Sequence, residues 1–247
     1  MEFIKSTQNT LIKRISALKD GKARKVESMF IAEGVRIVLD AGITPKYLFV
    51  DEAHVDFARS WESKCSVYQV SEEVLAKLSD TKSPQGVVAV YDIPKDCDYS
   101  MTGERAIILD GVQDPGNVGT IIRTAVASGY DIYLINCADI YSPKVVRSTM
   151  SGVFKSNMHV VTYEQMKDIL AKRGAKLYSL DMGGQDIFET KFSTPYALLV
   201  GNEAQGISEW AKTNSDYIVS IPMRETIESL NAGVSAGIAM YVTAYKK

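Results

Sequence analysis

The spacing of apolar residues changes repeatedly along the chain, and these changes predict an alternation of helices and strands. Residues 9–19 carry Leu11, Ile12, Ile15 and Leu18 at the spacing of an amphipathic helix. Short apolar runs then predict strands at 29–32, 47–50, 67–70 and 86–91, with helices at 34–41 and after Ser71. This half of the chain is therefore expected to form a small α/β domain.

Residues 93–103, IPKDCDYSMTG, are polar and turn-rich, and they predict a linker between domains 1–92 and 104–247. In the second domain, strands are expected at 106–109, 132–135, 160–162, 176–180, 197–200 and 217–221, with helices from Asn117 or Val118, over 144–154 and from about Leu230. Such alternation predicts a mostly parallel sheet with helices on both faces.

Charge is distributed unevenly. The net charge of −2 and the pI near 5.8 argue mildly against a nucleic-acid binder. The N-terminal segment is nevertheless basic, with Lys5, Lys13, Arg14, Lys19, Lys22, Arg24 and Lys25 against Glu2 and Asp20. Two interpretations stay open: a surface that meets phosphates, or a solvated helix face followed by a basic, glycine-containing loop.

Several classes of protein are disfavoured by residues that the sequence lacks. Cys65, Cys97 and Cys137 are scattered and form neither a disulfide framework nor a zinc pattern. The two histidines, His54 and His159, are expected on the surface or in loops, so no metal is predicted. We find no signal peptide and no apolar run of membrane-spanning length, and we therefore expect a cytoplasmic protein.

The first candidate site is LDGVQDPGNVGTIIRTAVASG, residues 109–129, which follows a predicted strand and opens a helix. Ligands of open α/β sheets bind at such carboxyl ends of strands. Asn117 is expected to cap the helix, and neither dinucleotide nor phosphate-loop glycine fingerprints are present. Arg123 stands in an otherwise apolar helix, where it either covers apolar surface with its stem or serves a function.

Two further blocks follow. In LLVGNEAQGIS, residues 198–208, a strand ends at Gly201 and Glu203 follows it, either as a site carboxylate or as the partner of a helix dipole. In residues 220–245, Pro222 ends a strand, and a helix rich in glycine and alanine follows Ser229-Leu230-Asn231. So many small residues favour close packing of that helix against another backbone or a ligand.

In this order and spacing, the blocks resemble motifs 1, 2 and 3 of the SpoU (TrmH-type) RNA 2′-O-ribose methyltransferase family of the SPOUT class. The matching signatures are N-x-G-x-x-x-R-T-A (Asn117 to Ala125), G-N-E-x-x-G (Gly201 to Gly206), I-P-M (Ile221–Met223) and S-L-N (Ser229–Asn231). Many members have glycine where this chain has Ala204, a small residue that is expected to preserve the loop.

The resemblance is strong over 104–247 and looser before it. The segments FIAEGVRIV and SPQGVVAV, residues 30–38 and 83–90, look like the small substrate-binding domain of members that act on ribosomal RNA. The implied fold is a SPOUT-type, mostly parallel sheet with a C-terminal trefoil knot. The implied partners are RNA and a second copy of the chain, with the site completed across the homodimer interface.

The resemblance also implies S-adenosyl-L-methionine as methyl donor, which transfers a methyl group to a ribose 2′-hydroxyl, in 23S ribosomal RNA. The implied donor pocket comprises Leu180, Gly201, Ile221, Met223 and Leu230. The residues implied for catalysis and positioning are Arg123, Asn117, Glu203, Ser229 and Asn231. Arg123 either removes the hydroxyl proton or, because arginine is a poor base, holds a phosphate and stabilises the developing alkoxide.

Three alternatives remain at this stage. A transfer RNA 2′-O-methyltransferase would use the same motifs on another RNA. A non-catalytic RNA-binding homologue would keep the fold, although the retention of Arg123 and Asn231 speaks against it. A nucleotide-binding enzyme with an ordinary α/β sheet is disfavoured by the missing phosphate fingerprints.

Overall fold

The computed structural model describes residues 1–94, 99–224 and 229–245. These residues form two compact units, the first made of Met1–Lys95 with Tyr141–Phe154 and the second of Asp96–Ile140 with Lys155–Lys247. Cys97 and part of the predicted linker lie outside the described residues.

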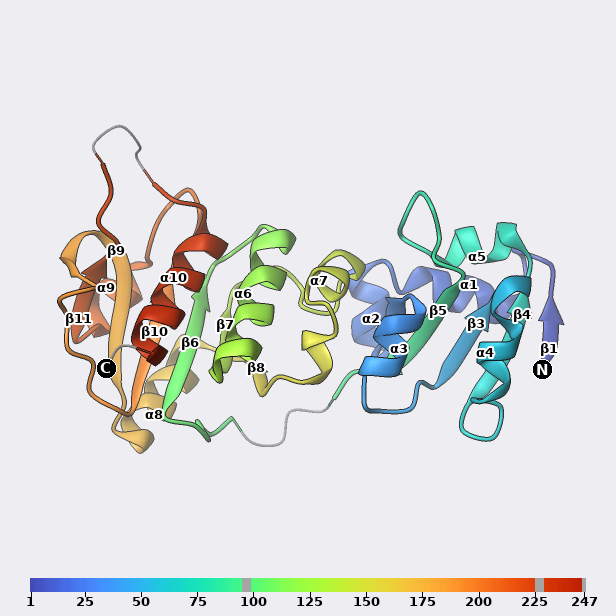
Figure 1. Ribbon diagram of the computed structural model, residues 1–247, viewed down its shortest axis with the longest axis horizontal. Helices are drawn as coiled ribbons and strands as arrows, with labels where there is room; N and C mark the ends of the chain where they lie inside the picture. The colour runs from blue at the N-terminus through green and yellow to red at the C-terminus, as the bar shows by residue number, and fades with distance from the viewer. Residues whose placement is uncertain (95–98, 225–228, 246–247) are drawn as a thin grey trace. The chain divides into compact units, whose positions relative to one another are not determined.

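The first unit is built on a mixed five-stranded sheet with strand order β1-β4-β3-β5-β2 (Figure 1). Strand β1 runs parallel to β4, as does β3, whereas β5 is antiparallel to both β3 and β2. The strands are β1 (Glu2–Ile4), β2 (Met29–Glu33), β3 (Tyr47–Val50), β4 (Ser66–Val70) and β5 (Val87–Asp92). The helices are α1 (Thr10–Ala17), α2 (Gly21–Glu27), α3 (Val35–Asp40), α4 (Val55–Arg59), α5 (Glu72–Leu78) and α7 (Pro143–Ser148), with 3-10 turns at Glu52–His54 and Gly152–Phe154.

Helix α1 confirms the amphipathic pattern of residues 9–19. Its apolar side chains Ile12, Ile15 and Leu18 are fully buried in one core cluster with Val74 and Leu78 of α5. The side chain of Asn9 accepts hydrogen bonds from the first free backbone N–H groups of the helix and so defines its start.

The prediction of a basic loop after α1 is wrong, because residues 21–27 form helix α2. Asp20 caps this helix through the backbone N–H of Lys22. Arg24 is buried, and its Nη1 donates to the carbonyl oxygens of Leu18 at 2.6 Å and Lys19 at 2.8 Å. Part of the N-terminal basic excess therefore satisfies the carbonyl end of α1 and is not available to phosphates.

The segment Tyr141–Phe154, which the predicted domain boundaries assign to 104–247, packs within the first unit. The Phe154 ring lies 4.7 Å from that of Tyr91 on β5, and the Tyr141 ring lies 4.9 Å from that of Phe30 on β2. The helix predicted over 144–154 is shorter, because the positive φ angles of Met150 (49°) and Ser151 (72°) interrupt it.

The second unit holds a six-stranded, fully parallel sheet with strand order β11-β9-β10-β6-β7-β8 (Figure 1). The strands are β6 (Arg105–Asp110), β7 (Asp131–Ile135), β8 (Met158–Val160), β9 (Lys176–Asp186), β10 (Tyr196–Val200) and β11 (Tyr217–Ser220). The helices are α6 (Pro115–Ser128), α8 (Tyr163–Arg173), α9 (Glu209–Asn214) and α10 (Ala232–Tyr245). The parallel sheet predicted for this half of the chain is confirmed.

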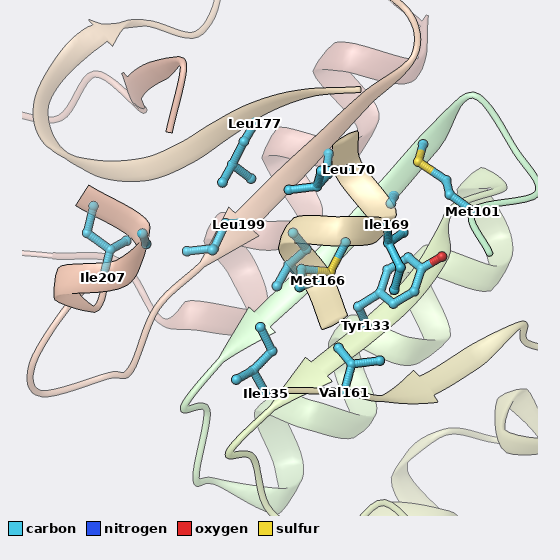
Figure 2. Packing of buried hydrophobic residues seen from close by; sticks show 14 residues of the cluster. Met101, Tyr133, Ile135, Val161, Met166, Ile169, Leu170, Leu177, Leu199 and Ile207 are labelled. Atoms are coloured by element: carbon cyan, nitrogen blue, oxygen red, sulfur yellow. The ribbon is translucent and has the colours of Figure 1, made fainter. Parts of the chain in front are cut away.

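Helices cover both faces of this sheet. On one face, Met166, Ile169 and Leu170 of α8 point toward Tyr133 and Leu199 of the central strands (Figure 2). On the other face, α6 and α10 lie side by side and pack against one another (Figure 1). Burial on both faces explains why the central strands are continuous apolar runs without alternation.

Candidate methyltransferase site

The three motif blocks meet at one edge of the parallel sheet. Val200, the last residue of β10, pairs with Leu109 of β6 and with Leu180 of β9. The residues that follow β6 and β10, which carry motifs 1 and 2, therefore emerge together on the carboxyl side of the sheet. This is where open α/β sheets bind ligands.

Motif 1 begins helix α6 earlier than the sequence indicates. Asp114 is the N-cap, its side chain accepts the N–H of Asn117 at 2.9 Å, and Pro115 takes the first helical position. The prediction that Asn117 caps the helix is therefore wrong. The Asp-Pro pair is the sequence signal that identifies the true cap, because proline is favoured at the first position of a helix.

Because Asp114 caps the helix, the Asn117 side chain is available for other hydrogen bonds, and it links all three motifs. Its Nδ2 donates to Glu203 Oε1 of motif 2 at 2.9 Å, and its Oδ1 accepts from Asn231 Nδ2 of motif 3 at 2.9 Å. Asn231 in turn caps α10, with its Oδ1 accepting the N–H groups of Gly233 at 2.9 Å and Val234 at 3.2 Å. We call Glu203, Asn117 and Asn231 the polar relay.

The position of Asn117 in the relay is nearly closed to solvent, with 9 % of its surface exposed. Both of its side-chain polar atoms are satisfied within the relay, so its rotamer is defined from two sides. The amide orientation follows from the partners, since a carboxylate can only accept a hydrogen bond.

The carboxylate of Glu203 is held in its charged form. Burial is the largest single influence and would raise its pKa, but several hydrogen bonds together outweigh burial. They come from the Asn117 amide and from the backbone N–H groups of Glu203, Gln113 and Asp114. The pKa of Glu203 therefore lies below its ordinary value, and the site presents a negative charge at neutral pH.

The motif 2 loop is a tight turn between Gly201 and Ser208. Asn202 and Gly206 exchange backbone hydrogen bonds of 2.9 Å in both directions. A Cβ atom on Gly201 would lie 2.2 Å from the Gly206 carbonyl oxygen, so only glycine fits there. Ala204 departs from the glycine common in the family, yet it donates normally to Asn202 Oδ1 at 2.9 Å, and the loop is closed as expected.

The small residues of motif 3 permit close contact between α10 and α6. A Cβ atom added to Gly233 would lie 3.3 Å from the Cβ and Cγ2 atoms of Thr120. Ala236 and Ala239 are fully buried on the same helix. The small residues therefore allow α10 to pack closely against α6, here against a side chain of that helix.

Arg123 lies apart from the polar relay. It is exposed, and within residues 1–94, 99–224 and 229–245 it has no hydrogen-bond or ion-pair partner. Six residues separate it from Asn117 on α6, a rise of about 9 Å. Ser229 is likewise exposed and does not join the relay. A single chain therefore does not bring all five predicted catalytic residues together.

The predicted donor residues Leu180, Ile221 and Leu230 are half-buried: Leu180 lies within β9 opposite Val200, Ile221 directly follows β11, and Leu230 lies two residues before α10. Met223 is 38 % exposed, and residues 225–228 between it and Leu230 lie outside the described residues. Of these residues, Leu180 is placed next to the motif 2 loop, because it pairs with Val200, the residue before Gly201.

The part of the chain that the structure describes contains no group of three or more His, Cys, Asp or Glu side chains that could hold a metal ion. The expectation that His159 lies on the surface or in a loop is wrong, because this residue is buried on β8 between the rings of Tyr99 and Tyr133. Over the described ranges, no helix has the length and apolarity needed to cross a bilayer.

Comparison with known proteins agrees with this geometry. Residues 104–241 match the profile of the SpoU rRNA Methylase family, and residues 9–89 match an MRM3-like substrate binding domain. The chain belongs to the SpoU rRNA methylase family. A similar relative is the 23S rRNA guanosine 2′-O-methyltransferase RlmP of Bacillus subtilis, with 31 % identity over 98 % of both chains.

Solved structures of this family resemble the whole chain. The AdoMet-bound rRNA methyltransferase of Sinorhizobium meliloti superposes with a TM-score of 0.89 at 29 % identity, covering 98 % of this chain and 97 % of that one. The SpoU methyltransferase AviRb of Streptomyces viridochromogenes, in complex with AdoMet, gives a TM-score of 0.84 at 29 % identity over 96 % and 97 %. The recognised family and the α/β fold class are thus confirmed.

Proposed function

We propose that this protein is an S-adenosyl-L-methionine-dependent methyltransferase that modifies a ribose 2′-hydroxyl in 23S ribosomal RNA. The observation that carries the proposal is the polar relay, which joins the three family motifs at the carboxyl edge of the sheet. The relatives named above act on 23S rRNA or are bound to AdoMet, which supports the same substrate and donor here. Ribosomal RNA lies in the cytoplasm of bacteria, and this is the compartment that we propose.

A transfer RNA substrate is the second candidate, and the extent of the structural matches argues against it. One solved structure concerns the 2-OH methylation of C/U34 on tRNA and superposes with a TM-score of 0.52. The match spans 93 % of that chain but only 56 % of this one. The rRNA methyltransferase of Sinorhizobium meliloti covers 98 %. The additional substrate-binding domain therefore favours ribosomal RNA.

For the donor, we propose a pocket formed by Leu180, Gly201, Ile221, Met223 and Leu230. The aliphatic side chains would cover the adenine, and the backbone of the motif 2 loop would supply hydrogen bonds. S-adenosyl-L-methionine, when bound, supplies a methyl group already activated by its sulfonium. The protein then needs to orient the ribose hydroxyl and to help it lose its proton.

For the ribose, we propose that Arg123 contacts the phosphate or the developing alkoxide, while Ser229, Asn231, Asn117 and Glu203 position the nucleotide. The guanidinium is exposed and has no described partner that would have to be displaced. Its charge and fork of donors suit an oxyanion. Arginine is a poor base, because a guanidinium keeps its proton in proteins, so we favour electrostatic stabilisation.

We also propose a homodimer with α10 at its interface. Helix α10 buries Ala236, Ala239 and Met240 on one side, yet its other side exposes Val234, Tyr241 and Tyr245. Helices that are apolar all round are normally buried on both sides. A second copy of the chain would cover this stripe and would bring an Arg123 to a relay from which it is separated within one chain.

The family's trefoil knot is a further part of the proposal. Strand β11 lies at the sheet edge beside β9, whereas the next described helix, α10, returns to α6 and the central strand β10. The contacts of α10 with elements far from β11 in the sheet order support threading of the C-terminal segment. Knots are otherwise rare in proteins.

Two measurements test the function. Isothermal titration should show S-adenosyl-L-methionine binding and no binding of NAD, and 2′-O-methyl mapping of 23S rRNA from a deletion strain should reveal one missing modification. If the titration detects no binding of S-adenosyl-L-methionine, the methyltransferase proposal is overturned. A methyl group missing from transfer RNA instead would favour the second candidate.

The shared site is tested by mixing two inactive variants, Arg123→Ala and Asn231→Ala, after unfolding and refolding together. If Arg123 of one protomer serves the relay of its partner, half of the dimers are mixed and each has one intact site, giving about a quarter of wild-type activity. No recovery, or a monomer by light scattering, would refute the shared site.

A further inference from the structure

Asp110, the last residue of β6, is a buried carboxylate that belongs to none of the family signatures. Only 3 % of its surface is exposed. Its Oδ1 accepts the hydroxyl of Tyr163 at 2.7 Å, and its Oδ2 accepts the backbone N–H of Ser208 at 3.2 Å. Within the described ranges no cation pairs with it, so these hydrogen bonds are what offsets the loss of its hydration.

Asp110 and its neighbour Gly111 hold the motif 2 loop at both ends. At the start of the loop, Asn202 Nδ2 donates to the Gly111 carbonyl oxygen at 2.8 Å. At its end, Ser208 donates to Asp110. The Asn202–Gly206 pair closes the interior of the loop, so these two anchors act on the loop as a body, together with the hydrogen bonds that Glu203 accepts in its middle.

Tyr163 supports the second anchor from the face of the sheet that α8 covers. It is the first residue of α8, and its ring stacks on Trp210 of α9 with centroids 5.1 Å apart. Helix α9 begins directly after Ser208, which is its N-cap. The same side chain therefore fixes α9 through its ring and Asp110 through its hydroxyl. Burial raises the pKa of Tyr163, so the hydroxyl stays protonated and able to donate.

We infer that Asp110 and Tyr163 are positioning residues for the methyl-transfer site, which hold the loop from Gly201 to Ser208 so that Gly201 and Glu203 stand in their binding positions. The inference rests on the proposed function. Neither residue is expected to touch the donor or the ribose, because both act through the backbone of the loop. A purely structural role would lower stability without a selective effect on that loop.

The test uses the full chain with Tyr163→Phe, which removes one hydroxyl and keeps the stacked ring. Hydrogen exchange of the amides of residues 202–208 should become at least about tenfold faster than in the wild type, while exchange of the central strands stays unchanged. The Kd for S-adenosyl-L-methionine should rise about five- to tenfold. Asp110→Asn keeps one acceptor oxygen and should give a smaller change in the same direction.

Tyr130→Phe is the matched control. The Tyr130 hydroxyl is also buried and contacts Tyr196 at 2.9 Å, Thr243 at 2.6 Å and the Met240 carbonyl oxygen at 3.1 Å. It lies beyond the C-terminal end of α6, away from the carboxyl edge of the sheet. This variant should lose stability, but donor affinity and exchange at 202–208 should remain as in the wild type.

The possible outcomes separate the two proposals. Unchanged exchange and affinity in Tyr163→Phe, or an equal loss of affinity in Tyr130→Phe, would overturn the positioning role. If Tyr163→Phe does not fold, Asp110→Asn is judged by the same two readouts. A wild-type chain that fails to bind S-adenosyl-L-methionine would refute the function, while the exchange measurement would still report whether Asp110 and Tyr163 order the loop.

Discussion

Asn117 and Glu203 are joined by a 2.9 Å hydrogen bond although 86 residues separate them in the chain. The amide donates and the carboxylate accepts, so the bond also keeps Glu203 ionised. Helix α6 and the motif 2 loop are thereby fixed to each other at the point where both leave the sheet.

Replacing Asn117 by aspartate should reverse this interaction. Two carboxylates would face each other, and we expect the single-turnover methylation rate at pH 7 to fall at least about tenfold, with partial recovery at lower pH as one carboxyl gains a proton. Asn214→Asp, at the end of α9, is the matched control and should keep its activity. A wild-type rate in Asn117→Asp would contradict a role for the relay.

The pH dependence of stability follows from the lowered pKa of Glu203. A carboxyl whose pKa is lower in the folded chain stabilises the fold above its ordinary value of 4.5, and this contribution disappears as the pH falls through the folded value. Glu203→Gln should therefore melt below the wild type at pH 7 by about 1–3 °C, because the carboxylate is partly exposed and its effect is small. The two melting curves should converge in acid, and a difference independent of pH would contradict this account.

Gly201→Ala should disrupt the motif 2 loop, because its Cβ would overlap the backbone of Gly206 and Ile207. We expect donor affinity to fall at least about tenfold, measured by calorimetry. Gly103→Ala is the matched control, since its Cβ would meet its nearest atom at 3.6 Å and no positive φ is required. Equal donor affinities in the two variants would show that the loop tolerates the side chain.

Arg123→Ala should strongly slow methylation without damaging the fold. The side chain is exposed and has no described partner, so the melting temperature should be unchanged and donor Kd should stay within about twofold. The single-turnover rate should fall by about 100-fold or more, as for the loss of an oxyanion contact. Arg123→Lys should recover only part of the rate, because lysine lacks the two-pronged geometry. Normal turnover in Arg123→Ala would remove this residue from catalysis.

Much of this architecture can be predicted from local patterns in the sequence. Continuous apolar runs identified the central parallel strands, and glycines and prolines marked the turns where the motifs lie. Family membership followed from three short signatures in order. Their common edge could be expected, because parallel strands present their carboxyl ends together.

The missed features depend on contacts between distant residues. Asn117 looked like a helix cap because the preference of asparagine for such positions is local, whereas its bonds to Glu203 and Asn231 are not. The helix at 21–27 depends on the Asp20 cap and on the buried Arg24, neither of which produces an apolar period. Asp110 and Tyr163 lie 53 residues apart, and nothing in the sequence near either one points to the other.

The packing of residues 141–154 with the first unit has a consequence for how this protein can be recombined. The chain leaves the first unit, returns to it for this short strip, and leaves it again, so a cut in the linker does not yield two self-sufficient halves. Phe30 and Tyr91 would lose the rings of Tyr141 and Phe154. A chimaera that exchanges substrate specificity between relatives must therefore inherit the N-terminal domain and this strip from the same parent.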